Sequence, residues 1–333
     1  MSRNRCYSCL VAIVLTCNLP LTHAQQRGWV NEVMPNGMSL GQLHGEYLWA
    51  KTGEIMIFVP AGPSQSIVFG SDAQGRPFVH PEYVSLAGFY IGKNDVTIAT
   101  FRKFAVATGY KTEAEQIGKA TIPSPPKGYE EKQGSSWASP GFPQTDQNPA
   151  VLLTWNDAKA YCDWAGGRLP TRDEWLKAAL WDDDSLRLRI LPWGLPGIMA
   201  PYLPGVPAPP QYADAKKGNF FDAAYYRAMS IAVPPGVQVV DDGYGFTSPV
   251  GNYPAGVSFY GVNDAAGNVS DWTSDLITPA MQLFSNHMLG DGYVAMGSNF
   301  LSPATFPAYL PITYRALPGG LICIGVRLVI PAV

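Results

Sequence analysis

Charged side chains are scarce in this chain. Lys, Arg, Asp and Glu make up 15% of its 333 residues, whereas a typical globular domain contains about 25%. Basic residues are not in excess, because the formal net charge is -3 at pH 7. A surface that binds nucleic acid needs clustered Lys and Arg, so the composition argues against nucleic acid as a partner.

Apolar runs long enough to cross a bilayer are also missing. The run Leu10 to Leu15 is too short for a transmembrane helix, follows two arginines and precedes the small-residue pattern Thr22-His23-Ala24. Residues 1–24 therefore predict a secretory signal peptide cleaved before Gln25. The mature protein is expected in the periplasm or outside the cell, with no transmembrane segment. A lipoprotein acylated at Cys17 and a buried N-terminal helix are the alternatives.

Cysteine becomes rarer still after that cleavage. Three of the five cysteines lie in residues 1–24, which leaves Cys162 and Cys323. In an oxidising compartment these two can form one disulfide, and a loop of about 160 residues closed in this way is worth a few kcal/mol. The alternative is a pair of buried thiols that do not meet.

Glycine, proline and apolar residues are plentiful. The 34 Gly and 30 Pro make up about a fifth of the chain, against roughly 12% in average proteins. Hydrophobic residues account for 47% and aromatic residues for 12%, which excludes an intrinsically disordered chain. These values predict a folded domain with a sizeable core and many tight turns.

Three helices and several strands are predicted in the first half of the chain. The β-rich run Glu54–Val59 ends at Pro60, and 67–70 and 83–91 read as further strands. One helix is expected over 97–108, ended by Gly109. A second starts at the N-cap Thr154 and stops at Gly166-Gly167, and a third starts at Thr171, which forms a capping-box pattern with Glu174.

The rest of the chain shows little periodicity. Residues 111–148 are polar and rich in Pro and Gly, residues 192–217 read as an extended loop, and helix signals vanish after Pro192. Short β-like pieces follow at 237–240, 250–253, 293–295 and 326–330. We therefore expect a lead-in over 25–53 and a single α+β domain over 54–331.

A series of short motifs then points to one family. They run in order from Phe58-Val59-Pro60-Ala61-Gly62 through Gly166-Gly167-Arg168-Leu169-Pro170-Thr171 and Gly267-Asn268-Val269-Ser270-Asp271-Trp272 to Gly325-Val326-Arg327. In order and spacing the chain resembles the formylglycine-generating enzyme, or sulfatase-modifying factor, family over nearly all of 54–330. The resemblance implies one C-type-lectin-like α+β domain with little regular secondary structure.

The resemblance also implies two structural Ca²⁺ sites. The first falls on Asn219, Phe220, Asp242 and Tyr244, and the second on Asp264, Gly267, Val269 and Asp271. Asp271 stands where the family usually has Glu, and carboxylate, amide and carbonyl oxygens remain available at both sites, as Ca²⁺ requires. The alternative is that these Asp and Asn residues only stabilise turns.

The catalytic cysteines of the family are absent. Formylglycine-generating enzymes bind copper(I) through two thiolates shortly after a Gly-Gly-Ser motif. Here that motif reads Met296-Gly297-Ser298, and the two cysteine positions correspond to Leu301 and Phe306, neither of which can bind copper. The resemblance is therefore to a member without the catalytic pair, and copper is not expected as a cofactor.

Three functions stay open at this stage. The first is an exported ligand-binding or accessory protein for a peptide, glycan or small molecule, with cleft candidates Ser298, Asn299, Phe300, Tyr314 and Arg315. The second is an oxidoreductase-type enzyme that matures a peptide natural product, as in siderophore maturation, without the usual cysteine–copper site. The third is a formylglycine-generating oxidase acting on a sulfatase cysteine.

Overall fold

The structure is a computed structural model that describes residues 33–124, 129–194, 214, 216–233, 241–282, 292–304, 306, 308, 312–313 and 319–333. Six α-helices lie in these ranges: α2 (Ile98–Thr108), α3 (Glu113–Ile117), α4 (Trp155–Ala165), α5 (Arg172–Leu180), α6 (Ala223–Ala228) and α7 (Pro279–Gln282). A 3₁₀ turn, η2, covers Pro254–Gly256. No helix in this part of the chain is both long and apolar enough to cross a membrane.

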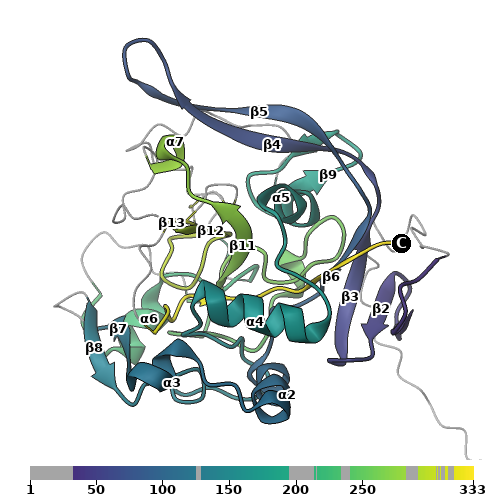
Figure 1. The fold of residues 1–333 in the computed structure, drawn as a ribbon. Coiled ribbons are helices and arrows are strands. Elements are labelled where there is room, and N and C mark those ends of the chain that lie inside the picture. The colour runs from purple at the N-terminus through teal and green to yellow at the C-terminus, as the bar shows by residue number, and fades with distance from the viewer. Residues whose placement is uncertain are drawn as a thin grey trace, which may run out of the picture.

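A five-stranded antiparallel sheet organises the fold. Its order is β1 (Met38–Leu40), β2 (Glu46–Trp49), β3 (Glu54–Val59), β6 (Phe89–Gly92) and β15 (Val329–Pro331). The last strand of the chain thus pairs with β6 from its first third, as Figure 1 shows. Two of the five strands, β1 and β2, come from the residues predicted as a lead-in.

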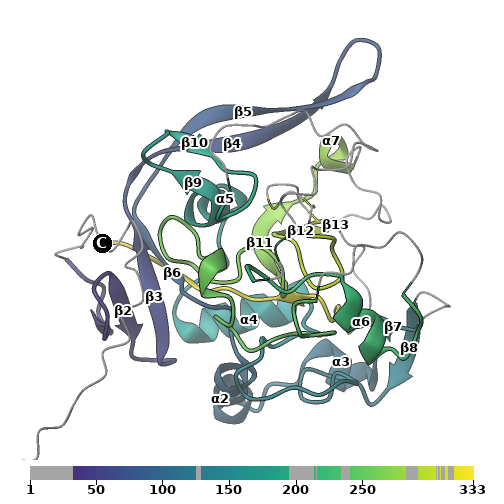
Figure 2. The ribbon, with the colours of Figure 1, turned by 180° about the vertical axis from the view of Figure 1, so that it is seen from behind.

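The remaining strands form one small sheet and three hairpins. The small sheet has the order β13 (Ile312–Thr313), β12 (Tyr293–Met296), β11 (Ser270–Leu276) and β14 (Ile324–Gly325). The hairpins are β4 (Gly62–Ser71) with β5 (Pro77–Leu86), β7 (Lys119–Pro123) with β8 (Tyr129–Gln133), and β9 (Trp181–Asp182) with β10 (Arg187–Leu188). The β4–β5 hairpin arches over α5, and its tip extends beyond the body of the molecule in both ribbon views (Figures 1 and 2).

The two faces of the large sheet bury different halves of the core. Successive side chains of a strand point to opposite faces. Met56 and Tyr90 belong to the cluster that includes Phe101 of α2 and Tyr161 of α4. Their neighbours Ile57, Val59, Phe89 and Ile91 join the cluster that includes Trp175 and Leu176 of α5. Helices α2 and α4 therefore share one hydrophobic cluster with the sheet, and α5 shares the other.

The three predicted helices are confirmed by their caps. Thr97, Thr154 and Thr171 each accept a backbone N–H at the start of α2, α4 and α5. The capping box predicted at Thr171 and Glu174 is present, and α2 and α4 end in left-handed glycines, Gly109 and Gly166. The predicted α+β class with a single domain is confirmed as well.

Several strand and loop predictions need correction. The apolar run 83–91 is split between β5 and β6, whereas 250–253 forms no strand and leads into η2. Residues 111–148 contain α3 and the β7–β8 hairpin, and helices α6 and α7 occur after Pro192. The predicted strand at 237–240 lies outside the described residues, as does most of the predicted loop over 192–217.

Candidate functional site

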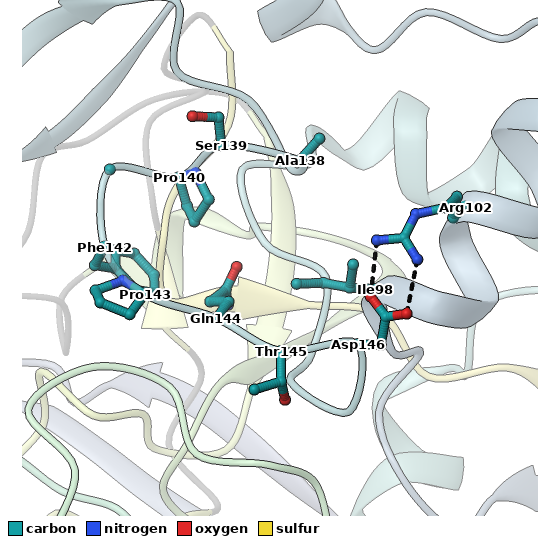
Figure 3. Close-up of a pocket in the computed structure, with 11 residues that line it drawn as sticks. Ile98, Arg102, Ala138, Ser139, Pro140, Phe142, Pro143, Gln144, Thr145 and Asp146 are labelled. Carbon is teal, nitrogen blue, oxygen red and sulfur yellow. Dashed lines mark hydrogen bonds and ion pairs between the residues drawn. The ribbon is translucent and has the colours of Figure 1, made fainter.

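A loop of nine residues, 138–146, encloses the larger of two neighbouring hollows. This larger hollow has a volume of about 420 Å³ and is completed by Ile98 and Arg102 from α2, as Figure 3 shows. Arg102 and Asp146 form a paired contact at one wall, with Nη1–Oδ2 and Nη2–Oδ1 distances of 2.9 and 2.8 Å. Because the two charges neutralise each other, the wall carries no net charge.

Hydrogen bonds from outside the loop hold its shape. The side chain of Asn148 accepts bonds from the backbone N–H and hydroxyl of Thr145 and donates to the Thr247 carbonyl at 2.9 Å. The Gln144 amide donates to the Thr247 hydroxyl at 2.7 Å, while its buried Oε1 has no hydrogen-bond partner among the described residues. The side chains of Gln144 and Asn148 therefore fasten the loop to the segment around Thr247. Asn and Gln suit this role because their amides both donate and accept hydrogen bonds.

The smaller hollow adjoins the first. It measures about 220 Å³ and shares three lining residues with the larger one, Pro140, Gly141 and Phe142. Apolar side chains from β7, from Met229 at the C-cap of α6, from the 241–251 loop and from the C-terminal segment provide most of its remaining wall, and Glu130 and Lys132 of β8 bring charge to it. The remaining members are Ile122, Pro123, Ser124, Met229, Phe246 and Ile322. We refer to the two hollows together as the two-part groove.

Phe142 separates the groove from the core. Its ring stacks on Phe246 with a centroid distance of 4.5 Å and an interplanar angle of 10°. Both rings contact the fully buried Phe300, at 6.4 and 6.1 Å. The groove therefore has an aromatic wall that continues into the core, as ligand sites commonly do.

The prediction that 298–300 lines a cleft is wrong. The side chains of Ser298, Asn299 and Phe300 are all 0% exposed. Ser298 Oγ accepts the backbone N–H of Gly267 at 3.0 Å, and Asn299 donates to Ser270 Oγ at 2.9 Å. The polar atoms of Ser298 and Asn299 are taken up by these hydrogen bonds inside the core, so the side chains support the fold. The other two candidates, Tyr314 and Arg315, lie outside the described residues.

The two positions that hold cysteine in copper-binding relatives are apolar and packed. Leu301 lies half-buried against the cluster of α2 and α4, and Phe306 lies half-buried against the cluster of α5. Hydrocarbon side chains offer no ligand to copper(I), which binds soft thiolates. The donor set at these positions does not fit that metal.

The predicted disulfide is not present. Cys162 and Cys323 are both buried cysteines that are not joined to each other. Burial, and then the negative charge of Glu54, raises the pKa of the Cys162 thiol well above its usual value. Cys323 belongs to the same hydrophobic cluster, and its backbone carbonyl accepts from the Ser270 N–H.

The residues of the first predicted Ca²⁺ site are brought together. The backbone N–H groups of Phe220 and Tyr244 both donate to the Asp242 carboxylate, at 2.6 and 2.9 Å. Burial, and then Asp222 and Asp241, raises the pKa of Asp242 to about 7. The Asn219 side chain is fully buried, and its Oδ1 has no partner in the described structure. An unsatisfied amide oxygen beside excess negative charge fits a hard cation.

The second predicted Ca²⁺ site lies on a tightly turned loop. Asp264, Gly267 and Asn268 have positive φ angles of 53°, 89° and 56°, a conformation that side chains other than Gly, Asn and Asp rarely adopt. Asp264 accepts from the Gly251 N–H, and burial raises its pKa to about 6. Asp271, 1% exposed, leaves Oδ1 without a donor. The residues present therefore fit a cation here too.

Side chains alone do not form a metal cluster. Among the described residues there is no group of three or more His, Cys, Asp or Glu side chains placed to hold a metal ion. Both predicted sites depend instead on one or two carboxylates combined with amide and backbone carbonyl oxygens, which is a donor set that Ca²⁺ accepts.

Arg327 is buried next to the second predicted site, and the sequence shows it only as part of the Gly325-Val326-Arg327 motif. Its guanidinium binds Asp271 through Nε at 3.0 Å and Asp95 through Nη2 at 3.1 Å, and all three side chains are at most 1% exposed. Trp175 Nε1 also donates to Asp271, at 2.7 Å. The available signal was Arg327 itself, a charged residue between the apolar Val326 and Leu328. An Arg in such a segment indicates a buried ion pair, because Arg is rarely buried unless it is paired.

Comparison with known proteins identifies the relatives of the chain. A family model described as a sulfatase-modifying factor enzyme 1-like domain matches residues 48–329. The formylglycine-generating enzyme of Mus musculus is 30% identical over 213 residues, 58% of this chain and 50% of that protein. The hercynine oxygenase of Mycolicibacterium smegmatis is 29% identical over 283 residues, 79% of this chain and 53% of that protein. The chain thus spans about half the length of these relatives.

A solved structure agrees at the level of the fold. PvdO from Pseudomonas aeruginosa superimposes with a TM-score of 0.56 and 21% sequence identity, covering 86% of this chain and 98% of that one. At this identity the match shows a shared fold. The family model over residues 48–329 spans β3, β6, helices α2 to α7 and the small sheet.

Proposed function

Because the chain belongs to the family of the sulfatase-modifying factor enzyme 1-like domain, we propose that it is an exported ligand-binding or accessory protein without copper chemistry. The observation that carries this proposal is the packing of Leu301 and Phe306 at the two cysteine positions. A member that keeps the domain and fills those positions with core residues has lost the soft ligands for copper(I).

The two-part groove is the binding site in this proposal. Its hollows of about 420 and 220 Å³ meet at Phe142, and together they fall within the size range of ordinary small-molecule pockets. Its walls are mixed, with Phe142 and Met229 on the apolar side and the paired Arg102 and Asp146 on the polar side. Such a surface suits a peptide, a glycan or a small molecule.

Equilibrium dialysis against the exported small-molecule fraction of the producing cells tests this site. We expect one compound to be enriched by the purified protein and recovered with its mass unchanged. Phe142→Ala together with Met229→Glu should abolish the enrichment, because the substitutions remove the aromatic wall and place a charge in the smaller hollow. Val106→Ala, at a side chain 78% exposed on α2, is the matched control and should bind as the natural protein does. Equal enrichment by the groove variant would contradict the proposal.

An oxidoreductase-type maturation enzyme for a peptide natural product is the second candidate. The similarity to a protein named hercynine oxygenase favours it. The same dialysis experiment separates the two functions, because an enzyme returns its ligand with a changed mass. A deletion strain would then accumulate an unmatured precursor, whereas loss of an accessory protein lowers the yield without a precursor.

A formylglycine-generating oxidase is the third candidate and the weakest. We expect no tight copper(I) binding and no oxidation of cysteine in a sulfatase-type peptide, since Leu301 and Phe306 supply no thiolate. Stoichiometric copper(I) binding by the purified protein would restore this candidate.

Calcium belongs to the proposal as a structural cofactor. Asn219 and Asp242, with the carbonyls of Phe220 and Tyr244, would hold the first ion, and Asp264 and Asp271, with the carbonyls of Gly267 and Val269, the second. The buried unpartnered oxygens of Asn219 and Asp271 support this assignment. Bound Ca²⁺ would neutralise the local excess of negative charge and fasten loops that have few sheet hydrogen bonds. Metal analysis of the dialysed protein should give two calcium ions per chain.

Export is the remaining part of the proposal. Residues 1–24 lie outside the described part of the structure, so the support is the sequence pattern. Intact mass measurement of the protein recovered from the producing cells should give a chain beginning at Gln25. A chain that retains residues 1–24 would argue against a cleaved signal.

A further inference from the structure

Four charged residues line the two-part groove, and they differ in whether they are paired. In the larger hollow, Arg102 and Asp146 neutralise each other through the contact drawn in Figure 3. The other two, Glu130 and Lys132, line the smaller hollow. Neither of these side chains makes a hydrogen bond or an ion pair with any residue that the structure describes. The smaller hollow therefore presents one negative and one positive charge to a ligand.

The two unpaired charges stand side by side on β8. Glu130 and Lys132 are two residues apart in this strand, so their side chains leave it on the same face. Their backbone positions are separated by about 7 Å along the strand. A ligand in the smaller hollow therefore meets a carboxylate and an ammonium group as neighbours.

Gly141 leaves room for the ammonium group of Lys132. Its φ is 94°, a conformation that favours glycine. A Cβ at Gly141 would lie 3.1 Å from Lys132 Nζ and 3.7 Å from Ile122 Cδ1, so any side chain there would push the flexible end of the lysine away. Because Gly141 lines both hollows, the ammonium group lies beside a residue at which they meet.

The rest of the smaller hollow is largely apolar. Ile122, Phe142, Met229, Phe246 and Ile322 line it, and the stacked rings of Phe142 and Phe246 give it a flat aromatic wall. Its volume of about 220 Å³ is smaller than the roughly 300 Å³ at which pockets for drug-sized ligands begin. The hollow therefore suits a compact apolar group next to the two charges.

We propose that the smaller hollow binds a free amino acid with an apolar side chain. The inference rests on the binding function proposed above and names the chemical class of the ligand. The carboxylate of the amino acid binds Lys132, its ammonium group binds Glu130, and its side chain packs against the apolar wall. Both contacts are charge-assisted hydrogen bonds, which are stronger than those between neutral groups. A zwitterion carries its two opposite charges on one carbon, as two neighbouring side chains of opposite charge require.

A ligand with a single charge is the competing explanation. A fatty acid or the C-terminus of a peptide offers a carboxylate to Lys132 and leaves Glu130 without a partner. The N-terminus of a peptide does the reverse. Blocking one end of an amino acid at a time distinguishes these ligands from a zwitterion.

Equilibrium dialysis of the full chain against radiolabelled L-leucine tests the proposal. We expect saturable binding that unlabelled L-methionine displaces. N-acetyl-L-leucine lacks the ammonium group, L-leucinamide lacks the carboxylate, and L-serine lacks the apolar side chain. Each of these three should compete about 10-fold less well than L-leucine. Equal competition by N-acetyl-L-leucine or by L-leucinamide would overturn the inference, because one charge would then be enough.

Two variants assign the two ends of the amino acid. Lys132→Gln and Glu130→Gln should each weaken L-leucine binding about 10-fold. L-leucinamide should then compete as well as L-leucine in Lys132→Gln, and N-acetyl-L-leucine should do so in Glu130→Gln. Lys119→Gln is the matched control and should bind as the natural protein does. It removes a positive charge from the same hairpin, where Lys119 pairs with Glu131 at 2.6 Å outside the groove.

The outcomes separate this inference from the binding function on which it rests. Every residue of β8 is exposed, so the glutamine variants should fold, and their melting temperatures check this. Unchanged L-leucine binding in both variants would place the amino acid elsewhere and overturn the inference. A natural protein that binds no L-leucine but still enriches a compound from the exported fraction would overturn the inference and leave the binding function standing. If it enriches neither, the binding function falls as well.

Discussion

Arg327 carries more of the stability of this domain than any exposed ion pair can. Its guanidinium is fully buried and joins Asp95 in the β6–α2 turn to Asp271 in β11 and to the Asn263 carbonyl in the loop before β11. Removing one partner of a buried charge network leaves the others uncompensated, which is far costlier than losing a surface pair.

The substitution Arg327→Met tests this difference. It should lower the free energy of unfolding by about 3–5 kcal/mol, because Asp95 and Asp271 lose the guanidinium that binds both of them. Arg102→Met breaks the exposed pair with Asp146 and should cost less than about 1 kcal/mol. Urea unfolding followed by tryptophan fluorescence measures both. Similar losses of unfolding free energy in the two variants would show that the buried charges around Arg327 contribute no more than an exposed ion pair.

Glu54 lies away from the predicted metal ligands and makes a pH-dependent contribution to the stability of the folded protein. Its Oε2 accepts the Tyr161 hydroxyl at 2.8 Å, and its Oε1 is buried without a partner among the described residues. Burial raises the pKa of Glu54 above its usual value of 4.5. A carboxyl whose pKa is higher in the folded state stabilises the fold while it is protonated. This stabilisation is fully present below the unfolded-state pKa and is lost as pH rises through the folded-state pKa.

Glu54→Gln should remove this dependence. We expect the stability of the variant relative to the natural protein to increase as pH rises above about 4.5, because glutamine stays neutral. Urea unfolding at a series of pH values, in buffer with calcium held constant, gives the difference directly. A difference that stays flat with pH would show that Glu54 ionises normally in the folded state.

At the scale of elements, two adjacent glycines after α4 act for different reasons. Gly166 has a φ of 84° and ends the helix, and a Cβ there makes only an ordinary contact, 3.5 Å from Trp49. Gly167 has no such φ, but a Cβ there would lie 2.3 Å from the Val329 carbonyl oxygen. The first glycine is required by backbone conformation and the second by its approach to β15.

We therefore expect the alanine and asparagine variants to rank in opposite order of stability at Gly166 and at Gly167. At Gly166 we expect asparagine to be milder than alanine, whose left-handed conformation costs about 1–2 kcal/mol. At Gly167 asparagine should be worse than alanine, since any larger side chain adds to a clash with backbone that cannot move aside. Thermal unfolding of the four variants decides this. The same order at both positions would contradict the assignment.

Local signals explain which elements the sequence could predict. Helices α2, α4 and α5 were predictable because each begins at a threonine cap and, for α2 and α4, ends at a glycine, all within about a dozen residues. The β7–β8 hairpin was not, because every residue of β8 is exposed and shows no alternation. Helix α6 was not predicted because its six residues make fewer than two turns, which is too short to show a helical repeat of apolar side chains.

The candidate site was predicted less well for a related reason. Residues 298–300 begin at the last residue of the Met296-Gly297-Ser298 motif, yet their side chains are buried in this chain. The groove instead depends on residues 138–146, whose Pro and Gly content predicted only a loop, and on residues distant in sequence from β8 and the C-cap of α6. Contacts between segments so far apart follow from tertiary packing, which no single window of sequence contains.

At the scale of the molecule, long connections link distant parts of the chain. Strand β15 pairs with β6, and β14 pairs in parallel with β11. Among the described residues, the loops at 219–222, 241–251 and 264–268 lie outside the strands, so no ladder hydrogen bonds hold them. Two calcium ions at the predicted sites would fasten these loops to each other.

Calcium removal should therefore affect the whole molecule at once. In excess chelator we expect the melting temperature to fall by on the order of 5 °C or more, because each ion bound well above its dissociation constant contributes about 2–3 kcal/mol. Limited proteolysis should then cut within 219–251 and 264–268 before β3 or β6, since the large sheet does not depend on the ions. Magnesium at the same concentration is the control, and it should not restore the melting temperature, because it demands a tighter octahedral site. An unchanged melting temperature in chelator would mean that the buried carboxylates are held by protons and Arg327 alone.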